Sequence, residues 1–231
     1  MKATRWALGL TGDLFVTAGL LLLLFVGWQL WWTDVTANRV QDETVHSLTR
    51  DFASGSGSGA ATGADQAPAA VPFGKAFAIV RIPRLGEDYA RPVLEGTTHD
   101  ILMGGVGHYT GTAQPGAVGN FAIAGHRTTY GRPFHDIDRL REGDKVVLET
   151  RTEFFVYAVQ RHVIVAPTDV DVIAAAPEQV GAKPTKGWFT MTACHPKYSA
   201  AQRYVVFAEL EKSYPRAKGL PAGILAAPKG R

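Results

Sequence analysis

Two stretches decide the fold: WFTMTAC (Trp188–Cys194) and RYVVFAEL (Arg203–Leu210). Both are short and rich in β-branched and aromatic residues, which favour a pleated, half-buried strand. Four earlier stretches share this character: FAIVRI (Phe77–Ile82), NFAIAGH (Asn120–His126), KVVLET (Lys145–Thr150) and FFVYAVQRHVIV (Phe154–Val165). Glycines and prolines separate them, and no long stretch of helical period lies between them. The pattern predicts an all-β domain, a closed or nearly closed β-barrel, with short helices around Thr98–Met103 and Phe134–Leu140.

An apolar run lies near the amino terminus. LFVTAGLLLLLFVGWQL (Leu14–Leu30) has about 17 residues without charge, close to the roughly 20 that cross a bilayer as a helix. Lys2 and Arg5 precede it, and a positive flank stays on the cytoplasmic side. A cleaved signal peptide is the alternative, but bulky tryptophans stand where a cleavage site needs small residues. We expect residues 1–32 to form a cytoplasmic tip and a single-pass cell-membrane anchor, with the catalytic domain extracytoplasmic.

Composition divides the rest of the chain. Residues 33–74 are expected to be a flexible extracytoplasmic tether, because SGSGSGAATGADQAPAA (Ser54–Ala70) lacks large apolar residues, although Thr33–Phe52 is compatible with a helix. Residues 75–214, about 140 in number, suffice for one domain with its own core. Residues 215–231 are rich in Pro, Gly, Ala and Lys and are expected to be disordered. The net charge of +3 comes with no basic block in the body, so no nucleic-acid partner is indicated.

The chain has one cysteine, Cys194, at the end of a predicted strand and before His195-Pro196. Most free cysteines are small buried core residues, and that alternative stays open from composition alone. His126 also ends an apolar stretch, and Arg203 begins the stretch after the cysteine loop. Strand ends meet at the rim of a barrel. We therefore expect the three side chains to share one rim.

These three residue types suit acyl transfer by a thiol. A thiolate is the attacking species, and nearby positive groups favour its formation. An imidazole gives a proton to the departing amine. A guanidinium holds the substrate carbonyl or the oxyanion. The hypothesis is a cysteine transpeptidase with Cys194 as nucleophile.

The segment TMTAC (Thr190–Cys194), with Arg203 in the next strand and Gly125-His126 upstream, resembles the signature of sortases: a TLxTC strand, a later Arg and an earlier His. The strings GHYTGTAQPGAVGNFAIAGHRTTYGRPF and CHPKYSAAQRYVV are similar to those of class E, housekeeping-type sortases of high-GC Gram-positive bacteria. The likeness extends from about Phe77 to Leu210 and implies the sortase β-barrel.

The resemblance also implies a reaction. Cys194 would cleave a C-terminal LAxTG- or LPxTG-like sorting signal between Thr and Gly, His126 would act as acid and then base, and Arg203 would stabilise the oxyanion. An amine of a peptidoglycan precursor would then accept the secreted protein. Tyr109, Thr192 and Ala193 are the implied substrate contacts, and no cofactor is implied.

Two residues depart from the sortase pattern. Met191 replaces Leu at similar volume, and Ala193 stands where Thr is usual, which removes a hydroxyl beside the nucleophile. No carboxylate cluster suggests calcium; Glu87, Asp88 and Glu95 are interpreted as loop charges. We expect no metal.

Other functions compete with this interpretation. An L,D-transpeptidase would need a Ser-His-Gly-Cys segment, and a papain-like protease would place its Cys before its His. A pilin-polymerising sortase and a catalytically impaired, anchored peptide-binding domain remain alternatives. The segment before Phe77 contains no Asp-Pro lid motif, which favours the wall-attachment role.

Overall fold

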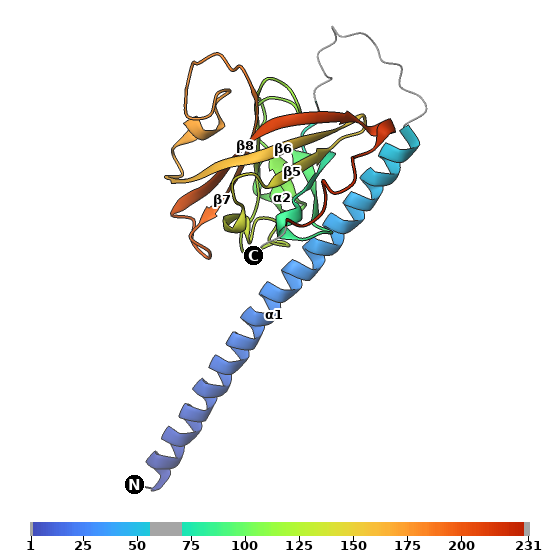
Figure 1. The fold of residues 1–231 in the computed structure, drawn as a ribbon. Coiled ribbons are helices and arrows are strands. Elements are labelled where there is room, and N and C mark those ends of the chain that lie inside the picture. The colour runs from blue at the N-terminus through green and yellow to red at the C-terminus, as the bar shows by residue number, and fades with distance from the viewer. Residues whose placement is uncertain (1, 56–70, 229–231) are drawn as a thin grey trace.

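The computed structural model describes residues 2–55 and 71–228, and a β-barrel forms the body (Figure 1). Eight strands build it: β1 (Ala76–Arg81), β2 (Ala90–Glu95), β3 (Val106–His108), β4 (Gly119–Ala124), β5 (Lys145–Glu149), β6 (Glu153–Val165), β7 (Gly187–His195) and β8 (Gln202–Pro215). Their order around the closed barrel is β1-β2-β3-β4-β7-β8-β6-β5. The predicted all-β closed barrel is confirmed.

Two strand pairs are parallel, β2 with β3 and β4 with β7, and the other neighbours are antiparallel. The parallel β4–β7 pair matters most for function. It brings the carboxyl ends of both strands to the same edge of the barrel, with Ala124 opposite Thr192. His126, which follows β4, and Cys194, next to the last residue of β7, therefore come to the same edge.

Alternate side chains of the strands fill the barrel. Phe121 and Ile123 of β4 and Phe189, Met191 and Ala193 of β7 belong to one buried apolar cluster. Successive residues of a strand point to opposite faces, so the residues between these face outward. The same alternation directs Thr192 and Cys194 away from the barrel interior.

Five short helical elements complete the body: α2 (His99–Met103) and the 3-10 turns η2 (Pro83–Leu85), η3 (Ile137–Arg139), η4 (Val170–Ile173) and η5 (Arg216–Lys218). The helix predicted over Thr98–Met103 is α2, for which Thr98 is the N-cap. The piece predicted over Phe134–Leu140 contains only the single turn η3.

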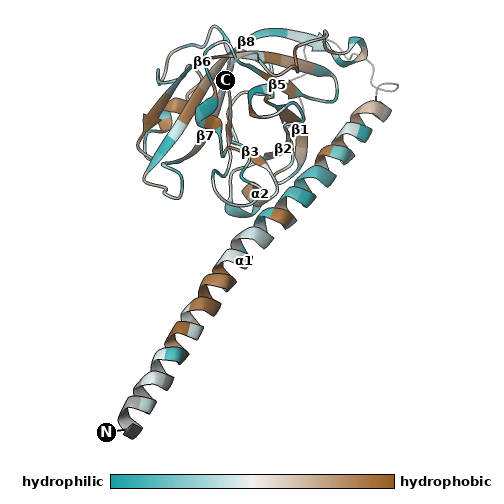
Figure 2. Ribbon diagram, turned by 60° about the horizontal axis from the view of Figure 1, so that its bottom comes forward, coloured by the Kyte–Doolittle hydropathy of each residue, from teal (hydrophilic) through white to brown (hydrophobic). Residues whose placement is uncertain are grey.

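One long helix, α1 (Lys2–Ser54), projects from the barrel (Figure 1). Its outer half carries an apolar stretch that nothing covers, including Leu20–Phe25, every residue of which is more than half exposed (Figure 2). By length and composition, α1 is the one helix among the described residues able to cross a membrane. The exposed apolar stretch lies within residues 1–32, and the anchor itself stays a prediction.

The predicted flexible tether is wrong for residues 33–54. They continue α1 and pack on the barrel, because a stripe of side chains at helical spacing faces β1 and β2. The buried members of the stripe are Ala37, Gln41, Val45, Leu48 and Phe52. Val45, Leu48 and Phe52 form a cluster with Ile79 of β1. Residues 56–70 of the predicted tether lie outside the described residues.

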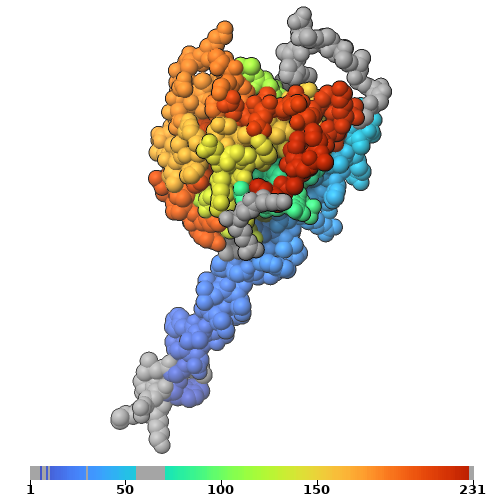
Figure 3. Space-filling view, in the orientation of Figure 1, coloured from blue at the N-terminus to red at the C-terminus, as the bar shows by residue number. Residues whose placement is uncertain are grey.

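The predicted disorder from residue 215 is also wrong at its beginning. Strand β8 runs to Pro215, and Arg216 is tied to the barrel. Its guanidinium donates to Glu149 Oε1 (2.7 Å) and to the Thr150 carbonyl (3.0 Å), and it lies over the Phe52 ring. In Figure 3 this carboxyl-terminal part (red) lies close to the end of α1 (cyan). Residues 229–231 lie outside the described residues.

Candidate active site

A pocket of about 220 Å³ opens at the barrel edge where β4 and β7 end. All six predicted site residues line it. The complete lining is Thr97, Leu102, Tyr109, Ala124, Gly125, His126, Thr192, Ala193, Cys194 and Arg203. His126, Cys194 and Arg203, which are far apart in the sequence, therefore lie on one concave surface formed by three strand ends.

The antiparallel pairing of β7 with β8 sets Cys194 directly opposite Arg203. Cys194 is partly exposed, so it is not the packed core residue of the alternative interpretation. Arg203 Nη1 donates to the carbonyls of Ala200 and Gln202, both at 2.9 Å. A guanidinium has five N–H donors, and those on Nε and Nη2 have no hydrogen-bond partner among the described residues.

His126 reaches the pocket through a close backbone approach. The Gly125 N–H donates to the Thr192 carbonyl at 3.0 Å, which extends the β4–β7 pairing beyond the strand. A Cβ at position 125 would lie 2.6 Å from the Phe134 ring, so only glycine fits there. The Phe134 N–H donates to the His126 carbonyl at 3.0 Å and fixes the backbone on the other side.

The imidazole of His126 lies among other rings. The centroid of its ring is 5.8 Å from that of His99 and 5.1 Å from that of Tyr130. Burial, and next the charge of His99, lower the pKa of His126 below its ordinary value. Its Nε2 atom is buried and has no hydrogen-bond partner among the described residues. That nitrogen is therefore committed to no other group in the described part of the chain.

Tyr109 and Thr192 form one side of the pocket. The Tyr109 hydroxyl and Thr192 Oγ1 are 2.9 Å apart, and Thr192 Oγ1 also donates to the Ile123 carbonyl at 3.3 Å. Both hydroxyls are therefore fixed in place. Ala193 differs from them: it lines the pocket, but it also belongs to the barrel's apolar cluster and is 3% exposed.

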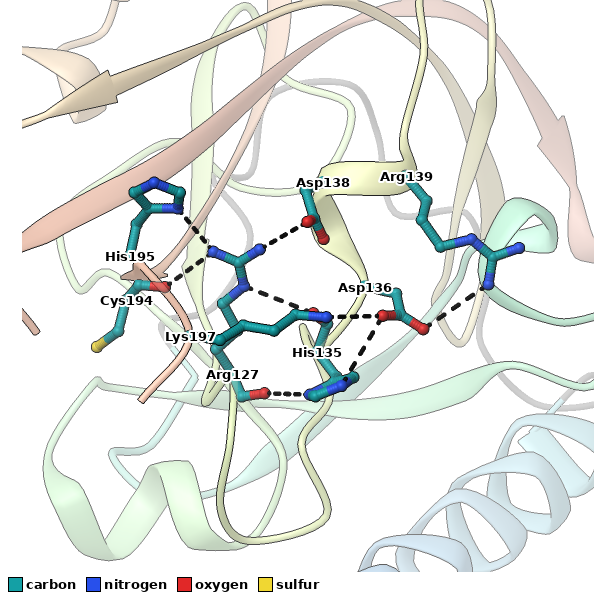
Figure 4. A network of polar contacts seen from close by, with 8 residues as sticks. All are labelled: Arg127, His135, Asp136, Asp138, Arg139, Cys194, His195 and Lys197. Carbon is teal, nitrogen blue, oxygen red and sulfur yellow. Dashed lines mark hydrogen bonds and ion pairs between the residues drawn. The ribbon is translucent and has the colours of Figure 1, made fainter. Parts of the chain in front are cut away.

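Behind the pocket, Arg127 joins the two strands that carry the cysteine and the histidine (Figure 4). Its guanidinium is buried; Nη1 donates to His195 Nδ1 (2.8 Å) and lies 3.5 Å from the Cys194 carbonyl oxygen. Nη2 pairs with Asp138 at 3.0 Å. The network fixes the backbone of Cys194 from the side opposite the pocket.

The remaining histidines lie outside the pocket. Figure 4 shows the Cys194 sulfur and the His195 imidazole pointing to opposite sides of the strand, so His195 does not orient the thiol. His108 is buried, and its Nδ1 atom lies 2.6 Å from Glu95 Oε2. His135 Nδ1 lies 2.9 Å from the Arg127 carbonyl oxygen. Because a carbonyl oxygen can only accept, Nδ1 is the donor.

The prediction that Glu95 is a loop charge is wrong. Glu95 is a buried carboxylate at the end of β2. It accepts from His108 and from Thr110 Oγ1 (2.7 Å), which explains why it is buried. Glu87 and Asp88 are exposed. Within residues 2–55 and 71–228, no group of three or more His, Cys, Asp or Glu is placed to hold a metal ion.

Sequence reasoning missed four contributors: His99 and Tyr130 beside the imidazole, and Thr97 and Leu102 in the lining. All four come from segments without strand pattern, whose position depends on the fold. Arg127 was also missed, although it adjoins His126 in the sequence.

A closed barrel with cysteine, histidine and arginine in one rim pocket is the arrangement of a cysteine transpeptidase. The family described as "Sortase domain" matches residues 80–211. The chain is 36% identical over 223 residues to sortase SrtE1 of Streptomyces coelicolor, which covers 93% of this chain and 60% of that relative. It therefore spans less than two thirds of that relative's length.

Solved structures agree with the sequence match. Sortase E of Streptomyces avermitilis aligns with a TM-score of 0.61 and 43% identity, over 66% of this chain and 99% of that one. Sortase E1 of Streptomyces coelicolor with a tripeptide in its active site aligns with a TM-score of 0.61 and 36% identity, over 67% and 99%. The chain belongs to the sortase family, whose members are cysteine transpeptidases.

Proposed function

We propose that this chain is a membrane-anchored transpeptidase that cleaves a C-terminal LAxTG- or LPxTG-like sorting signal between Thr and Gly. It then joins the secreted protein to an amine of a peptidoglycan precursor. The observation that carries the proposal is the single rim pocket lined by Cys194, His126 and Arg203. A tripeptide bound in the active site of a similar sortase E1 supports a peptide substrate.

In the first half of the reaction, the Cys194 thiolate attacks the carbonyl carbon of the substrate threonine. The oxyanion that forms accepts hydrogen bonds from Arg203, which lies across the strand pair from the cysteine. His126 donates its proton to the glycine nitrogen as the C–N bond breaks. A thioester on Cys194 and a free glycine amine result.

In the second half, the amine of the acceptor attacks the thioester carbon while His126 removes its proton. The C–S bond breaks, the thiolate returns, and an amide joins substrate to acceptor. The lowered pKa of His126 suits the base role, because the free imidazole predominates at neutral pH. The protonated form needed for the first half is then a minority.

Tyr109 and Thr192 are proposed to contact the residues of the signal that precede the scissile bond. Their linked hydroxyls stand on the pocket wall next to Cys194. The contribution of Ala193 is proposed to be space, since its methyl group carries no hydrogen-bonding atom. The apolar half of α1 is proposed to anchor the enzyme with the barrel on the extracytoplasmic side.

The test uses the full chain in detergent micelles with peptides ending in LAxTG or LPxTG and a small primary amine. We expect cleavage between Thr and Gly and an amide product with the amine, both identified by mass spectrometry. Cys194→Ala should give neither product. His126→Ala should lower the rate by about 10²–10⁴-fold, the usual contribution of a general acid.

Tyr198→Phe serves as the matched control, because that side chain is exposed in the loop after Cys194 and does not line the pocket. It should retain wild-type cleavage. If folded wild-type protein cuts neither peptide, the sorting-signal assignment is wrong.

A further inference from the structure

The turn that follows His126 has an unusual backbone. Tyr130 and Arg132 have positive φ angles, 52° and 47°, and Gly131 between them has a φ of 75°. Non-glycine residues adopt this left-handed region only where their surroundings impose it. Two such residues on either side of a glycine therefore require contacts that stabilise the turn.

Helix α1 supplies the holding contacts. The Gly131 N–H donates to Asp34 Oδ1 at 3.1 Å, and Arg132 Nε pairs with Asp34 Oδ2 at 2.9 Å. About two turns further along α1, Gln41 Nε2 donates to the carbonyls of Tyr130 (3.0 Å) and Met103 (3.2 Å). Gln41 is completely buried; its Nε2 group makes both contacts, and its Oε1 atom has no hydrogen-bond partner among the described residues.

Helix α1 packs closely against the turn that contains Gly131, with no room for a side chain at that position. A Cβ on Gly131 would lie 2.8 Å from Asn38 Oδ1 and 3.1 Å from Gln41 Nε2. Gly131 is thus required both by its φ angle and by the approach of α1. The bond of Gln41 to Met103 also joins the end of α2 to the same site, and α2 begins with His99.

Both of these segments reach the imidazole of His126. The Tyr130 ring lies against His126 and, at 5.3 Å between centroids, against His99. The His99 ring lies edge-on to His126. Because the side chains that flank His126 stand on backbone held by Asp34 and Gln41, the position of the imidazole depends on α1.

We propose that the barrel-packed part of α1, through Asp34 and Gln41, positions His126 for catalysis, so that the membrane helix is a working part of the active site. Asp34 and Gln41 are positioning residues, since they touch neither the pocket nor the reacting atoms. The inference rests on the proposed transpeptidase function for its kinetic consequence, but the physical coupling between helix and turn does not.

The experiment uses the full chain in lipid nanodiscs, with Asp34→Ala and Gln41→Ala as the variants. Glu43→Ala is the matched control, because Glu43 is exposed on α1 and pairs with Arg39 of the same helix. The first readout is the steady-state kinetics on an LAxTG or LPxTG peptide. The second is backbone hydrogen exchange of residues 126–134, which requires no activity.

We expect kcat to fall roughly tenfold or more in both variants while KM changes less than about twofold, since a small displacement of a reacting group acts on the transition state. Hydrogen exchange of residues 126–134 should be faster than in Glu43→Ala. Asp34→Asn, which keeps an oxygen acceptor for the Gly131 N–H, should restore part of kcat.

Two results would overturn the proposal. One is exchange and kcat equal to those of Glu43→Ala; the other is faster exchange with unchanged kcat, which would make the contacts structural only. If wild-type protein cuts no peptide while exchange still responds to Asp34→Ala, the coupling between helix and turn is supported and the proposed function is refuted instead.

Discussion

At the scale of single residues, two features of its environment lower the pKa of the His126 imidazole. Burial disfavours its charged form, and the neighbouring His99 adds like-charge repulsion. Both lower the pKa, so the protonated form required to release the glycine amine becomes scarce as the pH rises. The pH dependence of the reaction therefore reports directly on this pair of rings.

We predict that His99→Ala raises the pKa of His126 toward its ordinary value by removing the repulsion. The limb of kcat/KM that falls with rising pH, governed by imidazolium, should then move to higher pH. The measurement is a pH profile on a sorting-signal peptide, with His46→Ala, an exposed histidine of α1, as control. A limb that lies at the same pH in both variants would contradict the assignment.

The Arg127 network leads to a prediction on stability. Arg127→Met removes buried, charged hydrogen bonds to His195 and Asp138 and should lower the free energy of unfolding by about 2 kcal/mol, within the range for such bonds. Chemical denaturation measures the change. Arg139→Met is the control, because Arg139 is exposed and its pair with Asp136 should contribute less than about 1 kcal/mol. Equal losses in the two variants would show that Arg127 has no special role.

Some of the residue-level site could be predicted from sequence and some could not. Cys194, His126 and Arg203 lie at the ends of recognisable strands, so the strand pattern alone brings them to the barrel rim. His99 begins the short helix α2 and Tyr130 lies in a turn, and the positions of both segments are set by long-range packing. Because neither residue lies at the end of a strand, the strand pattern does not predict their place beside His126.

At the scale of elements, the strands that sequence reasoning missed are the ones with weak local signals. Strand β2 contains Pro92, which cannot donate to a ladder, and β3 has three residues with glycine at its centre. Their pairing is imposed by neighbouring strands rather than by propensity. The long strands β6, β7 and β8 are rich in Val, Ile and aromatics, and each lies where the pattern predicted it.

The inner half of α1 was mistaken for tether because its polar composition concealed a stripe. Ala37, Gln41, Val45, Leu48 and Phe52 recur at intervals of three or four residues, which is the spacing of one helix face. The glutamine within the stripe interrupts its apolar character. That buried glutamine is one of the residues that hold the turn beside His126.

We predict that Phe52→Ala weakens the packing of α1 on the barrel. Phe52 is 2% exposed and lies under Arg216, and truncating a buried phenylalanine costs about 3–5 kcal/mol. Trypsin should then cleave at Arg50 faster than in wild type, as followed by mass spectrometry. Val40→Ala, at a site 52% exposed on the same helix, should leave the rate unchanged. Cleavage unaffected by Phe52→Ala would mean that this packing contributes little.

At the scale of the whole molecule, one continuous helix joins the apolar stretch of α1 to the barrel, where residues 33–54 were expected to be a flexible tether. The apolar stretch of α1 ends at Trp31 and Trp32, and Asp34 already contacts the body of the protein. With the apolar stretch in the membrane, as proposed, this helix would fix both the height and the orientation of the barrel above the bilayer. The end of α2, which lies next to Thr33 and Thr36, should face the membrane.

We predict different distances to the membrane for two labels in a Cys194→Ser background. A fluorophore on Asp100→Cys, which lies close to Thr33 and Thr36 of α1, should be quenched strongly by spin-labelled lipid headgroups in nanodiscs. One on Val180→Cys, in the β6–β7 loop (orange, far from the projecting half of α1 in Figures 1 and 3), should be quenched weakly. Equal quenching would indicate that the barrel moves freely on its anchor.

In the proposed reaction, the acyl group of the substrate is carried by one atom, the Cys194 sulfur. The most direct test is intact-mass spectrometry of the full chain after a brief incubation with sorting-signal peptide and no added amine, followed by peptide mapping. We predict an adduct with the mass of the peptide up to its threonine, located on Cys194 and discharged by a primary amine. An adduct at another residue, or product formation by the Cys194→Ala variant, would contradict the account.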